Sequence, residues 1–218
     1  MKAPELEAAS IVMLGSFNPA IFQPRWLGVQ KLIRTEEAES AKITTIQSEL
    51  ADFSTEWFHL QVLQNRFQIT SQDPRQYSPL RDLAAGSFAI LPHTPVTALG
   101  LNRSFHFEMP SVESWHGIGN LLAPKDLWNP IIEEPGLRSL NIQGRRKDAD
   151  GGVLHIKVEP SLRVAHGLFV EINEEFKAPS KDESDGARWA SERLVEHWDA
   201  ILRYSEEVAG YLLNLVNK

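Results

Sequence analysis

The sequence predicts an α+β fold: an antiparallel β-sheet of about five or six strands, with helices packed on one face and a long amphipathic helix at the C-terminus. Two observations lead to this prediction. Strand-like segments at 137–146, 153–159 and 163–172 are separated only by turn sequences, which is typical of an antiparallel meander. The last segment, from about Asp185 to Val216, repeats apolar residues with helical spacing. Because strands and helices do not alternate regularly, a parallel α/β sheet is disfavoured.

The composition indicates a globular protein with a packed core. Of the 218 residues, 42% are hydrophobic and 23% are charged. We expect a single domain over residues 1–218, with possible sub-units 1–125 and 126–218 that share one core. The net charge of −7 argues against a nucleic-acid partner, because nucleic-acid-binding surfaces are basic. The absence of cysteine excludes disulfides, thiolate catalysis and cysteine–zinc sites.

Neither a membrane span nor a secretory signal is evident in the sequence. A membrane-spanning helix needs about 18 or more apolar residues in a row, and no stretch approaches that length. The first residues, MKAPELEAASIVMLG, contain only a four-residue apolar run, whereas a signal peptide has a longer one behind a basic start. We therefore expect a soluble, cytoplasmic protein with no membrane partner.

Three segments of the first half have the composition of strands. Residues 11–14 form a short apolar run, and residues 57–70 (WFHLQVLQNRFQIT) predict one long strand. Between them, residues 25–33 are ambiguous between helix and strand, and residues 35–42 indicate a solvated helical turn or loop. The third segment, 96–109, alternates most clearly, with Thr97, Leu99, Leu101, Phe105 and Phe107 on one face and Ala98, Gly100, Asn102, Ser104 and His106 on the other.

Two shorter helices are predicted between the strands. Pro79 suits the first position of a helix over 79–91, whose apolar residues share one face, and prolines end it at Pro92. Ser111 is a residue type that caps helices, and it predicts a second helix from there to Leu122.

The last two strand candidates are expected to pair with their apolar residues on the same face of the sheet. A two-residue turn at Pro160-Ser161 would place His155 directly opposite His166, but it makes opposed residue numbers sum to 321. The shared apolar face requires an even sum, such as 322. His155 and His166 then point to opposite sides of the sheet. No metal site is therefore expected between them.

The segment Gly15–Pro19 (GSFNP) follows the first strand candidate and resembles the start of the phosphate-binding motif of nucleotidylyltransferases. In that family the glycine allows close approach of the nucleotide phosphates, and two histidines a few residues later stabilise the transferred phosphoryl group. The resemblance covers five residues, because residues 20–24 (AIFQP) stand where those histidines would be. A simpler interpretation is an Asn-Pro turn, anchored on the core by Phe17, Phe22 and Trp26.

Arg103 falls on the apolar face of its strand, between Leu101 and Phe105. A buried guanidinium needs a partner, so Arg103 must find a carboxylate, reach the edge of the core, or leave that face through a β-bulge. A structural ion pair or a bulge is the favoured interpretation. The alternative is a site for an anionic ligand, for which the candidate binding residues are Arg103 and Arg66, with His106 as an acid or base.

The C-terminal helix carries the strongest signal for an interaction. Its apolar residues are spaced alternately by four and three, and a flanking row widens the stripe. The stripe either covers the protein's own sheet, which the two-layer rule favours, or pairs with a second chain as a short coiled coil. The candidate interface residues are Leu194, Trp198, Ile201, Val208, Leu212 and Leu215.

No catalytic residue set, cofactor motif or metal-ligand spacing stands out in the sequence. The first functional hypothesis is a non-enzymatic binding or assembly protein, which meets a protein partner or forms a homo-oligomer through the C-terminal helix and a sheet edge. The alternative is a small-molecule enzyme or ligand-binding domain for an anionic ligand. A degenerate nucleotidylyltransferase-like protein is a remote alternative. No cofactor is expected.

Overall fold

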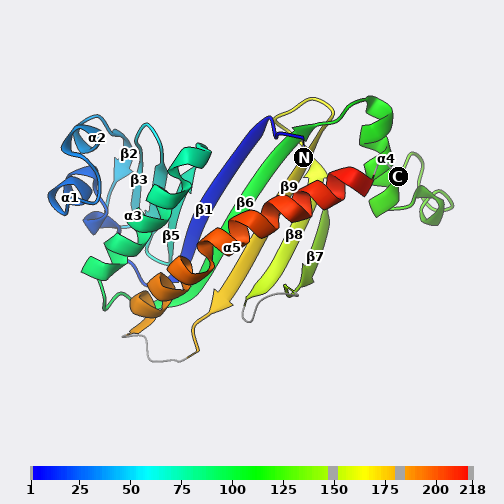
Figure 1. Ribbon diagram of the computed structural model, residues 1–218. Helices are drawn as coiled ribbons and strands as arrows, with labels where there is room; N and C mark the ends of the chain where they lie inside the picture. The colour runs from blue at the N-terminus through cyan, green and yellow to red at the C-terminus, as the bar shows by residue number, and fades with distance from the viewer. Residues whose placement is uncertain (1, 147–151, 180–184, 216–218) are drawn as a thin grey trace.

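The fold is built on one antiparallel sheet, seen in a computed structural model that describes residues 2–146, 152–179 and 185–215 (Figure 1). The strand order is β2-β3-β4-β5-β1-β6-β9-β8-β7. The predicted antiparallel sheet with helices and a long C-terminal helix is confirmed, but the predicted number of five or six strands is wrong, since the sheet has nine. The strands are β1 (Leu6–Gly15), β2 (Lys42–Ile46), β3 (Leu50–Ser54), β4 (His59–Leu63), β5 (Arg66–Ser71), β6 (Val96–Glu108), β7 (Leu140–Gly144), β8 (Val153–Pro160) and β9 (Gly167–Lys177).

The additional strands lie where the sequence pattern is weak or continuous. The strand predicted over 57–70 is the hairpin β4–β5, in which Leu63 pairs with Arg66 across a turn at Gln64-Asn65. Strand-forming residues continue on both sides of this turn, so the composition does not mark it. β2 and β3 have five residues each and carry many polar side chains, which gives them little apolar alternation to detect.

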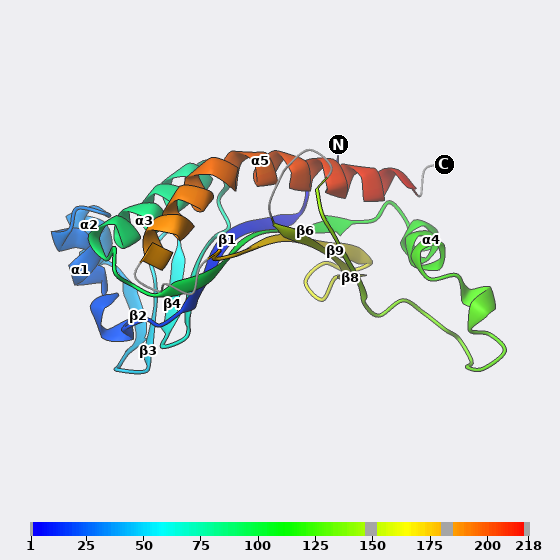
Figure 2. The same ribbon diagram turned by 90° about the horizontal axis from the view of Figure 1, so that it is seen from below.

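Two long helices cover one face of the sheet, α3 (Tyr77–Ile90) and α5 (Gly186–Asn214) (Figures 1 and 2). They contact each other, and α5 also contacts β6 and β9. This covered side is called the helix face, and the opposite side, with Asn102 and Ser104 of β6, is called the outer face. The other helices are α1 (Pro24–Val29), α2 (Thr35–Glu39) and α4 (Val112–Leu122), with 3-10 turns η1 (Pro19–Ile21), η2 (Pro74–Gln76) and η3 (Lys125–Leu127).

The helix ends follow local capping chemistry. Ser111 caps α4 as predicted, because its hydroxyl accepts a hydrogen bond from the backbone N–H of Ser114 at 3.1 Å. α3 begins at Tyr77, two residues before Pro79, because the turn η2 leads directly into it. Val216, the expected end of the C-terminal helix, lies outside the described residues, as do residues 147–151 between the strand candidates 137–146 and 153–159.

In the pairing of β8 with β9 the numbers of opposed residues sum to an even value, as predicted, but the loop between the strands is longer than expected. Ile156 opposes Ile172, so opposed residue numbers sum to 328, and the apolar residues of both strands share the helix face. The strand predicted to start at residue 163 begins at Gly167 instead, and the loop before it contains His166 with a φ of 47°. His155 opposes Asn173. His155 thus lies within β8, whereas His166 lies in the loop before β9, and the two histidines do not oppose each other.

The segment after β1 is a turn that brings aromatic side chains into the core. A side chain at Gly15 would place its Cβ 2.0 Å from the carbonyl oxygen of Pro95, so only glycine fits this close approach. The Asn18 side chain caps η1 by accepting a hydrogen bond from the backbone N–H of Ala20 at 3.2 Å. Phe17 and Phe22 are buried, and both pack against Phe67 and Phe88.

Trp198 of α5 is fully buried in the core between α5 and the sheet. We therefore expect Trp198→Ala to lower the free energy of unfolding by about 3–5 kcal/mol. The loss combines transfer free energy with the cavity left between α5 and the sheet. Chemical denaturation in urea measures it. Val195→Ala on the exposed side of the same helix is the control and changes the free energy by less than about 0.5 kcal/mol. Similar values for the two variants would contradict the packing described.

Candidate interaction surface

Arg103 lies on the helix face, where it is paired inside the protein. Its side chain is 2% exposed, and its Nη2 lies 2.8 Å from Oε2 of Glu7 and 3.5 Å from Oε1 of Glu206. The guanidinium carbon lies 4.5 Å from the ring centre of Tyr77 and 4.6 Å from that of Phe105. Arg103 therefore links β6 to β1, to α5 and to the start of α3, which is the structural ion pair favoured by the sequence.

The surroundings of Arg103 are strongly desolvated. Burial raises the pKa of Tyr77 to about 12, although the nearby guanidinium of Arg103 acts in the opposite direction. The phenol is therefore neutral at physiological pH. The Nε and Nη1 atoms of Arg103 have no hydrogen-bond partner among the described residues. With so little of the side chain exposed, its charge is compensated mainly by Glu7, Glu206 and the two aromatic rings.

The three predicted ligand-binding residues do not converge on one site. Arg66 and His106 both lie on strands that flank β1, opposite Leu14 and Leu6 respectively. These positions are eight residues apart along β1, which corresponds to about 26 Å at 3.3 Å per residue. Both side chains belong to the outer face, whereas Arg103 belongs to the helix face.

His106 holds the loop between β8 and β9. Its Nδ1 lies 2.8 Å from Oγ of Ser161, and the same Oγ accepts hydrogen bonds from the backbone N–H groups of Arg163 and Val164. The hydroxyl hydrogen of Ser161 is thus available to Nδ1, which favours a neutral imidazole. Burial and the positive charge of Arg163 lower the pKa of His106.

The apolar stripe of the C-terminal helix is divided between the core and the surface. Leu194, Trp198 and Ile201 are completely buried within the protein. These three candidate interface residues are therefore unavailable to a second chain, because the protein's own sheet and α3 cover this part of α5. Toward the C-terminus the same stripe lines a hollow, where Val208 and Leu212 are found. Leu215 is partly buried against the core.

That hollow lies between the second half of α5 and the edge of the sheet. It has a volume of about 520 Å³ and apolar walls from β7, β8 and the helix. On its rim Tyr211 is 65% exposed, and Ile142 of β7 is also exposed. The lining residues are Leu122, Leu140, Ile142, Ile156, Val158, Tyr204, Glu207, Val208, Tyr211 and Leu212.

A second hollow, also of about 520 Å³, is formed by the connection from α4 to β7. This connection exposes large apolar side chains, with Leu127 and Ile131 each 70% exposed and Trp128 nearly half exposed. Leu122 and Leu140 line both this hollow and the one beside α5, so the two adjoin.

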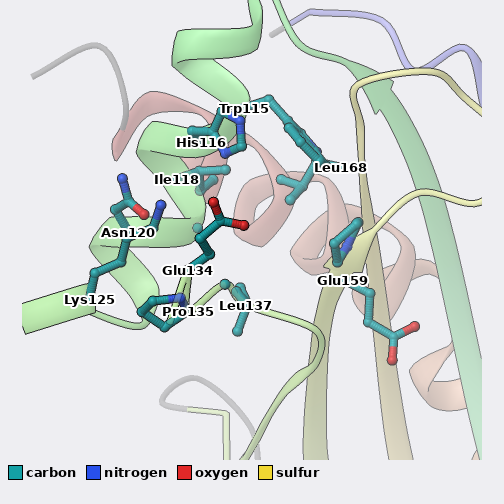
Figure 3. A pocket seen from close by; sticks show the side chains of 13 residues that line it. Trp115, His116, Ile118, Asn120, Lys125, Glu134, Pro135, Leu137, Glu159 and Leu168 are labelled. Atoms are coloured by element: carbon teal, nitrogen blue, oxygen red, sulfur yellow. The ribbon is translucent and has the colours of Figure 1, made fainter. Parts of the chain in front are cut away.

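A third hollow of about 450 Å³ lies on the other side of the same connection, between α4 and the ends of β8 and β9 (Figure 3). Its floor is apolar, with Trp115 and Leu168 facing it. In Figure 3 the carboxylate of Glu134 is directed toward Ile118, whereas the carboxylate of Glu159 points away from the hollow. Glu159 forms an ion pair with Lys157 at 2.9 Å. Residues 135–137 line both this hollow and the second one.

The three hollows therefore adjoin one another through shared lining residues at one end of the sheet, and together we call them the β7 surface. It comprises the lining residues of the three hollows and the exposed side chains of Leu127, Trp128, Ile131 and Ile142. Residues 123–136 (APKDLWNPIIEEPG) lie between the helix predicted to end at Leu122 and the strand candidate that starts at residue 137, and the sequence predicts no element there. The signal that could have identified it is its content of tryptophan, leucine and isoleucine, because connecting segments are usually polar.

Other kinds of site receive little support from the geometry. Among residues 2–146, 152–179 and 185–215, no cluster of three or more histidines and carboxylates is arranged to hold a metal ion. Nor does that part of the chain contain a helix with both the length and the apolar character to span a membrane.

No protein-family model matches the sequence, and no curated protein is significantly similar to it. The function must therefore be argued from the chain itself.

Replacing Arg103 tests its structural role. Arg103→Met leaves the carboxylates of Glu7 and Glu206 without their counter-charge, and because both are partly solvated we expect the free energy of unfolding to fall by about 1–3 kcal/mol. Adding Glu7→Gln relieves part of that loss. Arg66→Met on the outer face is the control, with an effect below about 1 kcal/mol. Urea denaturation measures all three variants, and a small effect of Arg103→Met would contradict the proposed pairing.

The burial of His106 and the nearby positive charge of Arg163 predict a loss of stability in acid. Because the folded protein lowers the pKa of His106 below its ordinary value of about 6.5, the unfolded chain takes up the proton more readily. The stabilisation is fully present above pH 6.5 and is lost as the pH falls through the folded pKa. We expect the slope of stability between pH 7.5 and 5 to be smaller in His106→Gln and unchanged in His93→Gln, an exposed histidine. Equal slopes in all three proteins would refute the assignment.

Proposed function

We propose that this protein is a non-enzymatic binding or assembly protein that acts through the β7 surface. The observation that carries the proposal is that three adjoining hollows lie at the β7 end of the described sheet, with exposed tryptophan, leucine and isoleucine side chains beside them. Contiguous apolar patches of this kind mark interaction sites on soluble proteins.

The energetics of burial support this role. Removing one large apolar side chain from water is worth about 1.5–3 kcal/mol, and the β7 surface presents several of them close together. Trp128 and Tyr211 are of the residue types that contribute most to binding at protein interfaces. The surface therefore has the chemistry of an interface core, with its charged groups on the rim.

The strand edge indicates what kind of molecule binds. β7 is the last strand in the order of the described sheet, with β8 as its strand neighbour. Its other edge can accept backbone hydrogen bonds from a polypeptide, which a small apolar molecule or a lipid cannot provide in a regular ladder. The partner that fits is thus a polypeptide with an extended segment and apolar side chains on one face.

The placement of the polar residues also favours binding over catalysis. Arg103 is committed to Glu7 and Glu206, and His106 is committed to the loop at Ser161. Neither faces the β7 surface, so two of the three candidate residues for an anionic ligand are engaged in holding the fold together.

Site-specific photo-crosslinking in cells tests the proposal. A photoreactive amino acid at Ile131, in the β7 surface, is compared with the same amino acid at Val29 of α1. The two positions are matched, because their side chains are 70% and 69% exposed. We expect a discrete protein adduct, with this chain or with another, from position 131 and little adduct from position 29.

Specificity is checked within the same experiment. Trp128→Ser should reduce the yield of the adduct at position 131 several-fold, because it removes a neighbouring apolar anchor. No discrete adduct from position 131, or equal adducts from both positions, would refute the proposed function.

A further inference from the structure

We infer that the polypeptide bound at the β7 surface is a second copy of this chain, and that the two copies join through their β7 strands into one continuous sheet. The inference rests on the proposed function, and it adds the identity of the partner and the strand register. It follows from the two edges of the sheet, from the sequence of β7 and from the position of α5.

The two edges of the sheet differ in their protection against pairing. Strands at exposed edges usually carry charged residues, proline or a bulge that prevents them from pairing with another chain. β2 has two such features, since it begins with Lys42 and its register with β3 shifts between Ile43 and Thr45. β7 (Leu140–Gly144, LNIQG) has no charged residue and no proline, and its register with β8 is continuous. β7 is therefore the edge that is open to another strand.

The sequence of β7 is complementary to itself. In an antiparallel pair centred on Ile142, that residue opposes Ile142 of the second copy, and Asn141 opposes Gln143. The register places Leu140 opposite Gly144 and Ser139 opposite Arg145, so no like charges oppose each other over 139–145.

The same register keeps both faces of the sheet matched. Ile142 pairs with Ile156 of β8, whose side chain belongs to the helix face, so Leu140, Ile142 and Gly144 belong to that face as well. Asn141 and Gln143 belong to the outer face. The central register therefore joins apolar residues to apolar residues, and amides to amides that can hydrogen-bond to each other.

The hollow beside α5 adds an apolar contact to the backbone pairing of the two β7 strands. A two-fold axis between antiparallel β7 strands is perpendicular to the sheet, so both α5 helices stay on the helix face. In Figure 1, β7 forms the margin of the sheet on the side toward which the second half of α5 extends. The hollows lined by Ile142, Val208 and Tyr211 in the two copies would then face the same axis and bury each other's apolar rims.

Assembly through β7 ends at two copies. The contact uses the same surface on both chains, so it is satisfied by one partner. The free edges of the resulting sheet are the two β2 strands, which are protected. The expected species is thus a closed dimer and not a filament.

Disulfide trapping tests the register directly, because the natural chain has no cysteine. Directly opposed residues of an antiparallel pair have Cα atoms about 4.5–5.5 Å apart, within the 4.4–6.8 Å that a disulfide accepts. Ile142→Cys is therefore expected to form a covalent dimer when oxidised glutathione takes up the two thiol hydrogens and is itself reduced. Asn141→Cys, whose counterpart is a diagonal neighbour about 7–8 Å away, should react at least tenfold more slowly. Ile43→Cys on β2 is the control for the other edge.

Sedimentation equilibrium tests the assembly without a covalent bond. The natural protein should reach twice its chain mass of 24.6 kDa as its concentration rises. Ile142→Lys places two positive charges opposite each other and should raise the dissociation constant at least tenfold. Ile43→Lys makes the same substitution at an exposed residue of the other edge strand, β2, and should leave the dissociation constant unchanged. If Ile142→Lys does not fold, the cysteine variants still decide the question.

Failure of this inference and failure of the proposed function can be distinguished. A monomer at all concentrations, or a dimer in which Ile142→Cys is trapped no faster than Asn141→Cys, would overturn the inference. An adduct between position 131 and a different protein would still support the proposed function. Loss of both the adduct and the dimer would overturn both.

Discussion

Trp198 and Ile201 of α5 are buried where this helix packs onto the sheet. This contact fixes the position of α5, on which the ion pairs of Arg103 and the coverage of the sheet both depend. It removes the widest part of the helix's apolar stripe from water and brings Glu206 to Arg103 at 3.5 Å. Glu7 approaches the same guanidinium from β1 at 2.8 Å. Burial of the arginine between these carboxylates is possible because apolar packing fixes both elements around it, and the pairing in turn opposes any sliding of α5 along the sheet.

The same packing leaves one end of the sheet incompletely covered. α5 lies against β6, β9 and α3, whereas toward its C-terminus it approaches β7 and β8 across an apolar hollow. The connection from α4 to β7 adds two further hollows, with its own apolar residues directed outward. The position of α5 therefore has two consequences: the helix covers the core at the centre of the sheet, and it leaves the β7 surface exposed at the end.

The sequence predicted those features that depend on long, one-sided periodicity. α5 and β6 were recognised because their apolar residues repeat over many positions, and the parity of β8 and β9 was correct because it depends only on alternation. Strands of five residues such as β2 and β3 are too short to show that periodicity, and the hairpin at Gln64-Asn65 interrupts no compositional run. The partners of Arg103 could not be predicted, since Glu7 lies 96 residues earlier in the chain and meets it only through the strand order. Nor could the β7 surface, because it combines segments from α4, β7 and α5.

An apolar surface and an unpaired strand edge are each common, but their combination restricts what can bind. Water can satisfy the edge of β7, and many molecules can fill an apolar hollow. A partner that satisfies both must present a strand with apolar side chains on one face and groups that accept amide hydrogen bonds on the other. β7 has this alternation itself, with Leu140 and Ile142 on the helix face and Asn141 and Gln143 on the outer face. A second copy of the chain therefore meets the requirement without any further sequence, and it brings with it the second α5 needed to close the hollow.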